Sequence, residues 1–83
     1  MVISNERRQM FTDLYRMAEY YEYPFQPGDV DGNAAWFIQA QNEKLIPFIT
    51  KYPNSRLAYD LAMAVVDDAN ERAKLANMQN SVV

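Results

Sequence analysis

Residues 54–78, with the sequence NSRLAYDLAMAVVDDANERAKLANM, belong to the longest stretch of the chain without glycine or proline. Residues spaced three or four positions apart in this stretch fall on one face of a helix. They are Ala58, Leu61, Ala62, Val65, Ala69, Arg72 and Ala73. Alanine fills most of this face, and small side chains allow other elements to approach closely. The pattern therefore predicts a long helix over residues 55–78, capped by Asn54 or Ser55, against which the rest of the chain packs.

The amino-terminal part of the chain has the pattern of another amphipathic helix, over about residues 5–22, with Ser4 as its cap. Its apolar stripe consists of Phe11, Leu14, Tyr15, Ala18 and Tyr21, with Met10 and Met17 beside it. Residues 23–32 follow as a connector in which prolines and glycines mark turns. The apolar Phe25 and Val30 predict that this connector is ordered rather than flexible.

The middle of the chain predicts a helix over about residues 33–52, with Asp31 as its cap. Pro47 interrupts this helix, because proline donates no backbone hydrogen bond and crowds the carbonyl four residues earlier. We expect a break near residues 44–47, either as a kink or as a split into two helices. With a tail at residues 79–83, these elements predict an all-α fold, a compact three-helix bundle. Its expected core consists of Phe11, Leu14, Ala18, Phe37, Leu45, Phe48, Ile49, Leu61, Ala62 and Val65.

The composition is that of one small globular domain covering residues 1–83. Hydrophobic residues make up 49% of the chain and charged residues 23%, which argues against disorder. The net charge of −3 argues against direct nucleic-acid binding. No apolar run approaches the length of a membrane span, so we expect a cytoplasmic protein without a membrane partner.

The sequence contains no catalytic or cofactor-binding motif. It has no histidine and no cysteine, which removes the commonest general base and the usual zinc ligands. Residues 29–33, DVDGN, look like part of a calcium-binding loop, but with Gly32 at the sixth position, Pro27 and Ile38 stand where oxygen ligands are required. A turn followed by a helix cap is expected there instead. We therefore predict no enzyme activity, no metal and no cofactor.

An acidic ridge on the predicted carboxy-terminal helix is the first candidate for partner binding. Its members are Asp60, Asp67, Asp68 and Glu71. Such a ridge could dock on a basic groove, including one that normally holds nucleic acid. The alternative is an ordinary solvated helix face, in which Asp68 pairs with Arg72 and Glu71 pairs with Lys74 at helical spacing.

An aromatic patch near the connector is the second candidate. It consists of Tyr20, Tyr23 and Phe25. Tyr20 and Tyr21 cannot both face inward, because neighbours on a helix point about 100° apart. Either these rings form an exposed contact surface, or the connector folds over the core and buries them, and the sequence leaves both possibilities open.

Several short features of the chain match a known group of proteins. They are Leu14-Tyr15, Tyr20-Tyr21, Pro24, Trp36 after an acidic turn, Lys51-Tyr52 before a corner, and Leu57-Ala58 with Leu61. Across about residues 11–66 the chain thereby resembles short helical proteins encoded by bacterial phages and mobile elements. The resemblance implies a small acidic protein that binds one host protein, and in size and charge the chain is similar to anti-defence proteins, including anti-CRISPR proteins.

Three functions are consistent with these features. The first is a non-enzymatic protein-binding protein, an accessory factor or inhibitor from a phage or mobile element, whose host partner carries a basic surface. The second is a self-assembling structural or regulatory subunit, in which the alanine face of residues 58–76 pairs with its own copy as a homodimer. The third is a helix-turn-helix DNA-binding module, which the acidic third helix disfavours because a recognition helix usually carries Arg, Lys or Asn.

Overall fold

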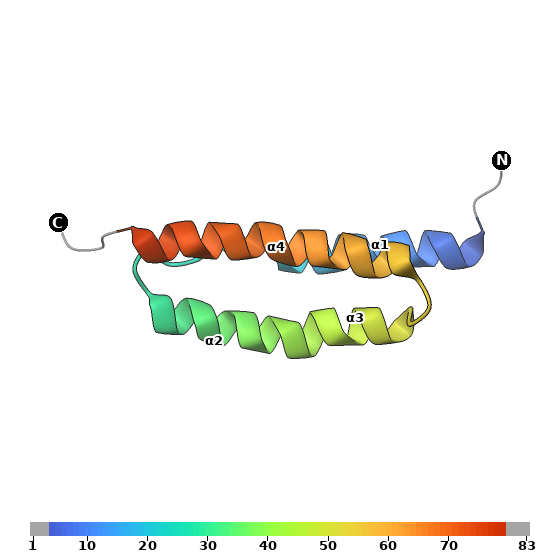
Figure 1. The fold of residues 1–83 in the computed structure, drawn as a ribbon, viewed down its shortest axis with the longest axis horizontal. Helices are drawn as coiled ribbons and strands as arrows, with labels where there is room; N and C mark the ends of the chain where they lie inside the picture. The colour runs from blue at the N-terminus through green and yellow to red at the C-terminus, as the bar shows by residue number, and fades with distance from the viewer. Residues whose placement is uncertain (1–3, 80–83) are drawn as a thin grey trace.

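The computed structural model describes residues 4–79, and every regular element in this range is helical. The first helix, α1, spans Asn5–Tyr20, and the last, α4, spans Arg56–Met78. Between them a second rod consists of α2 (Val30–Ala40), the π-helical segment η1 (Gln41–Leu45) and α3 (Ile46–Lys51). Figure 1 shows this rod running antiparallel to α1 and α4, which run in the same direction. The predicted all-α three-helix bundle is therefore confirmed.

The bundle is elongated, with extents of 56 × 24 × 17 Å. α1 packs on α3 and α4, and α2 packs on α4. α3 also packs on α4, so α4 contacts each of the other three α-helices, as its alanine face predicts. None of the helices within the described range has the length and apolar character that crossing a bilayer requires.

Side-chain caps fix where the helices begin. The hydroxyl of Ser4 accepts from the N–H of Arg7 at 3.1 Å, and the hydroxyl of Ser55 accepts from the N–H of Ala58 at 3.0 Å. Each satisfies one of the backbone donors that the first turn of a helix leaves free. Both caps agree with the sequence-based expectation.

The cap of α2 is Asp29, so the prediction of Asp31 is wrong and the helix begins at Val30 rather than at residue 33. The carboxylate of Asp29 accepts from the N–H of Gly32 at 3.1 Å. A capping side chain reaches the N–H three residues ahead, and glycine at that position leaves room for it. A β-carbon on Gly32 would lie 2.1 Å from Oδ2 of Asp29.

The predicted break near residues 44–47 takes the form of the π-helical segment η1. The N–H of Ile46 donates to the carbonyl of Gln41, five residues earlier, and Pro47 follows in the first turn of α3. The wider turn takes up one extra residue, which lets Ala40 and Leu45 share the core-facing side. Ala40 is 0% exposed and Leu45 is 7% exposed. The second rod is therefore joined through η1 and not split.

The alanine face of α4 lies at the centre of the core. Its buried members are Ala58, Ala62, Ala69, Ala73 and Ala76. This face packs against the other helices of the same chain. It is therefore not free to pair with a second copy, which corrects the homodimer expected through residues 58–76.

The apolar stripe of α1 is rotated relative to the prediction. Met10, Met17 and Tyr21 are buried, whereas Phe11 is 43% exposed and Tyr15 is 66% exposed. Two neighbouring stripes of α1 are both apolar, so its sequence alone does not decide which one faces the core. Among the other predicted core residues, Leu45, Phe48 and Ala62 are buried. Those only partly buried are Leu14, Ala18, Phe37, Ile49, Leu61 and Val65.

The connector between α1 and α2 is ordered because it is hydrogen-bonded to the carboxy-terminal half of α4. The guanidinium group of Arg72 donates to the carbonyls of Tyr21 and Tyr23. The N–H of Gly28 donates to the carbonyl of Ala76 at 2.8 Å, with Gly28 at a φ of 74° that favours glycine. These bonds fix the end of α1 and the following residues on α4.

Candidate functional site

The four carboxylates of the acidic ridge are all exposed on α4. Asp60, Asp67 and Glu71 point away from the bundle, because their positions on the helix lie opposite the buried alanines. Asp60 pairs with Arg56 at 3.0 Å, Asp68 with Arg72 at 3.3 Å, and Glu71 with Lys74 at 3.8 Å. Asp67 forms no ion pair with any residue in the range 4–79.

These ion pairs differ in how easily a cation of a partner protein could replace the cation of the chain itself. The side chains of Asp60 and Glu71 are 54% and 70% exposed, and exposed pairs contribute about 0–1 kcal/mol. A cation on a partner could therefore replace Arg56 or Lys74 at little cost. The partner of Asp68 is different, because Arg72 is only 33% exposed and is held by the connector carbonyls. Asp60, Asp67 and Glu71 are the available part of the ridge.

The aromatic residues form a half-buried cluster around Trp36. Tyr20 and Tyr23 stack on the Trp36 ring at centroid distances of 5.4 and 4.5 Å, and Phe25 meets it edge-on at 5.2 Å. Tyr20 and Phe25 pack against the core. Of the two possibilities that the sequence leaves open, the connector folding over the core is the one observed.

Cations of the chain itself cover part of this cluster. The ammonium group of Lys44 lies 4.8 Å from the centre of the Tyr20 ring, and the guanidinium carbon of Arg72 lies 5.6 Å from the centre of Phe25. Such cation–π contacts are attractive and occupy ring faces. The aromatic cluster is therefore less open to a partner than the acidic ridge is.

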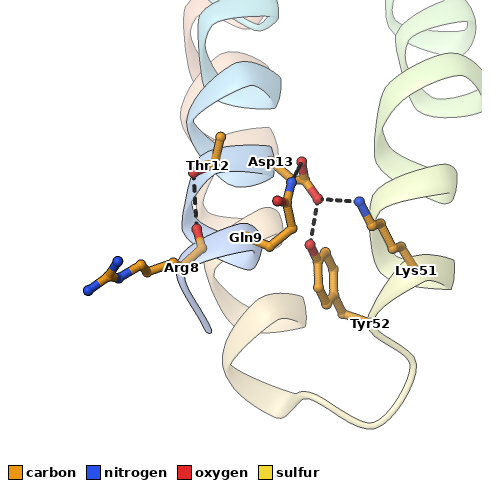
Figure 2. A network of polar contacts seen from close by, with 6 residues as sticks. All are labelled: Arg8, Gln9, Thr12, Asp13, Lys51 and Tyr52. Carbon is orange, nitrogen blue, oxygen red and sulfur yellow. Dashed lines mark hydrogen bonds and ion pairs between the residues drawn. The ribbon is translucent and has the colours of Figure 1, made fainter. Parts of the chain in front are cut away.

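A polar network joins α1 to the end of the second rod (Figure 2). The carboxylate of Asp13 accepts from Lys51 Nζ at 2.8 Å, from the hydroxyl of Tyr52 at 2.5 Å and from the amide of Gln9 at 3.0 Å. The hydrogen bond from Lys51, followed by that from Tyr52, lowers the pKa of Asp13. Burial, together with the Asp13 carboxylate, raises the pKa of Tyr52.

Perturbed pKa values can mark a catalytic site, but here the pairing itself accounts for them. Asp13 on α1 and its partners Lys51 and Tyr52 at the end of α3 form a clamp between these two helices. The clamp was not predicted from the sequence, because 38 residues separate Asp13 from Lys51 and no local pattern connects them.

Other candidate polar groups are the serine hydroxyls and the carboxylates of residues 29–33. The hydroxyls of Ser4 and Ser55 cap helices, and Ser81 lies outside the described residues. Within residues 4–79 no three His, Cys, Asp or Glu side chains lie close enough together to hold a metal ion. Of residues 29–33, Asp29 is the cap of α2 and the other four form its first turn, so the Asp29 carboxylate is used by the N–H of Gly32.

No protein-family model matches the chain, and comparisons with curated proteins and with solved structures give no match. Function therefore has to be inferred from the surface, charges and contacts of the chain itself. Among the predicted site residues, the structure places Asp60, Asp67 and Glu71 together on one outward line. It places Tyr20, Tyr23 and Phe25 together around Trp36. The three predicted aromatic residues belong to α1 and the connector, whereas the three carboxylates belong to α4.

Proposed function

We propose that this chain is a non-enzymatic protein that binds another protein through the acidic ridge of α4. The observation that carries the proposal is the line of Asp60, Asp67 and Glu71 on a 23-residue helix whose opposite face is buried. A helix held by its own core presents charges in fixed positions. Binding through it loses little conformational freedom, which favours association.

The spacing of these carboxylates indicates the shape of the partner. Along the helix axis, Asp60 and Asp67 are about 10 Å apart and Asp67 and Glu71 about 6 Å apart, from a rise of 1.5 Å per residue. A row of negative charges on a straight rod complements an extended basic groove. Such grooves commonly hold nucleic acid, and a protein docked there would exclude it.

The resemblance to phage and mobile-element proteins supports one kind of partner. It suggests an accessory factor or inhibitor of a host protein, such as a nucleic-acid-binding defence protein of the CRISPR type. The exposed carboxylates of α4 also argue against the helix-turn-helix alternative, because they would repel the phosphates that a recognition helix approaches.

The test is affinity capture from lysate of a bacterial host, followed by binding measurements with the captured protein. The double variant Asp67→Lys/Glu71→Lys should weaken binding at least tenfold, because each reversal replaces an attraction by a repulsion. The variant Asp31→Lys/Glu43→Lys has the same net charge but changes the second rod, and it should bind like the wild type.

A second measurement addresses the groove. Nucleic acid added to the complex should compete with the wild-type chain for the captured protein. Equal affinity of both double variants would contradict the ridge as the contact surface, and failure of nucleic acid to compete would contradict the basic groove as its target.

A further inference from the structure

An apolar strip runs between α1 and α4 on the side away from the second rod. Its hollow part, about 330 Å³, is lined by Leu14, Ala18, Leu61, Ala64 and Val65. Three larger side chains extend the strip: Phe11 is 43% exposed, Tyr15 66% and Leu57 37%. We call these eight residues the α1–α4 face. It is a stripe of the kind that amphipathic helices normally cover.

Charged residues are ordered by sign along α1 beside this face. Arg7 and Arg8 stand at its start, and Glu19 and Glu22 stand at its end, all exposed. Helix geometry places Arg7, Arg8 and Glu19 in the same sector of α1, about 120° wide, as Phe11 and Tyr15. Glu22 lies two residues past the end of α1. The carboxylate of Asp13 lies outside that sector, since it points to Lys51 of α3.

The four charges are free of intrachain ion pairs within the described residues. Figure 2 shows the side chain of Arg8 directed away from α3 and from the Asp13 network. Glu22 lines the hollow between α1 and α4, and Asp68 lines it from the α4 side together with its ion-pair partner Arg72. Glu19 and Glu22 are therefore the carboxylates that give this end its negative charge. The face is therefore basic at one end, apolar in the middle and acidic at the other end.

We propose that the α1–α4 face binds the same face of a second copy of this chain, in antiparallel orientation about a two-fold axis near Tyr15. Arg8 lies seven residues before Tyr15 and Glu22 seven residues after it. An antiparallel pair therefore brings Arg7 and Arg8 of each copy to Glu19 and Glu22 of the other. Because of the two-fold axis, this pairing of opposite charges occurs at both ends of the contact.

The charge order selects this arrangement over its alternative. A parallel pair would place Glu19 and Glu22 of one copy beside the acidic end of the other, where like charges repel. The apolar middle supplies the main attraction, because Phe11, Tyr15 and Leu57 lose contact with water in the pair. The product is a four-helix bundle built from α1 and α4 of both copies.

The size of the face indicates a dimer of modest affinity. α1 is 16 residues long, or about 24 Å, and two adjacent helices are roughly 20 Å wide. A contact of that outline covers on the order of 500 Å² of each copy, at the lower end of specific interfaces. Asp60, Asp67 and Glu71 are not among the eight residues of the α1–α4 face, and the contact is proposed without them.

Sedimentation equilibrium from about 1 µM to about 1 mM, a range that covers interfaces of this size, tests the proposal. The wild type should pass from a mass near 9.7 kDa toward twice that value. The variants Arg7→Glu/Arg8→Glu and Glu19→Arg/Glu22→Arg should each lose association at least tenfold, because like charges then face each other at both ends.

An equimolar mixture of the two variants should dimerise again, since every reversed charge then meets its opposite. Both variants should fold, because acidic residues suit the start of a helix and basic residues suit its end. Circular dichroism checks this. The control Ile38→Arg, on the 63% exposed side chain of α2, should associate like the wild type.

The outcomes that overturn the proposal are distinct. A wild type that stays monomeric over the whole range excludes the dimer. Variants that still dimerise alone, or a mixture that stays monomeric, exclude the antiparallel α1–α4 contact.

Discussion

The side-chain amide of Asn33 holds the backbone of Gln26 at both of its polar groups. Oδ1 of Asn33 accepts from the N–H of Gln26 at 3.0 Å, and Nδ2 donates to the carbonyl of Gln26 at 2.9 Å. The same Nδ2 donates to Oδ1 of Asn77 at 2.8 Å. Asn33 is 1% exposed, so this buried amide ties the connector, α2 and the end of α4 together.

Replacing Asn33 by alanine should destabilise the fold strongly. The change leaves the N–H and carbonyl of Gln26 and the amide of Asn77 without these bonds, at a cost of about 2–4 kcal/mol in free energy of unfolding. Urea titration followed by circular dichroism measures it. Asn70→Ala, an exposed asparagine of α4, is the matched control and should change the stability by less than about 0.5 kcal/mol.

Removing the hydroxyl should destabilise the fold at Tyr52 but not at Tyr21. The hydroxyl of Tyr21 is buried and has no hydrogen-bond partner among residues 4–79, so Tyr21→Phe should be neutral or stabilising by about 1 kcal/mol. The hydroxyl of Tyr52 donates to Asp13, so Tyr52→Phe should cost about 1–2 kcal/mol. Thermal unfolding of both variants provides the comparison, and a loss of stability in Tyr21→Phe would contradict the first expectation.

Stability should fall in acid partly through Asp13. Its pKa is lowered below the ordinary value of 3.8, chiefly by the hydrogen bond from Lys51 and then by that from Tyr52. A carboxyl group with a lowered folded pKa contributes stability above its unfolded pKa and loses it as the pH falls through the folded value. Asp13→Asn should therefore show a shallower loss of stability below about pH 4 than the wild type.

The stability of the fold at alkaline pH should also depend on the Asp13–Lys51–Tyr52 network. The pKa values of Lys51 and Tyr52 are raised, each through contact with Asp13 among its causes. Their contribution is present below the unfolded pKa and is lost as the pH rises through the folded value. Urea unfolding from about pH 2 to about pH 11 measures both limbs, and Asp31→Asn, an exposed carboxylate of α2, should keep the wild-type profile.

The π-helical segment should be removable without disturbing the core. Deleting Asn42 places Ala40 and Leu45 four positions apart, which is one helical face in an ordinary α-helix. Combined with Pro47→Ala, the deletion should raise the stability by on the order of 1–3 kcal/mol, because the backbone bonds of the turn can then form. Deleting Ala35 instead rotates Asn33 away from the core and should cost more than about 3 kcal/mol.

The sequence predicts the helices of this chain well, because the signals for them are local. The caps Ser4 and Ser55 act on residues three positions ahead, and the effect of Pro47 is felt within one turn. The acidic pairs Asp68–Arg72 and Glu71–Lys74 follow from helical spacing in the same way. The cap of α2 was misplaced by two residues because Asp29 and Asp31 are both residues of the capping type, and Asp31 lies in the first turn of the helix. The spacing of Asp29 to Gly32 is the signal that distinguishes them.

The contacts that join the helices were not predictable from such spacing. Arg72 and the carbonyl of Tyr21 are 51 residues apart, and Asn33 and Asn77 are 44 residues apart. The face of α1 was misassigned for a related reason. Met10 and Phe11 are equally suited to a core, and only the position of α4 decides between them.

The parallel course of α1 and α4 has a practical consequence. The chain enters the bundle at one end of its 56 Å axis and leaves it at the other (Figure 1). A domain fused ahead of α1 and another fused behind α4 would be kept apart by the full length of the rod. In such a fusion the fold would act as a spacer, and a donor and acceptor dye attached near Ser4 and Gln79 would report its length directly.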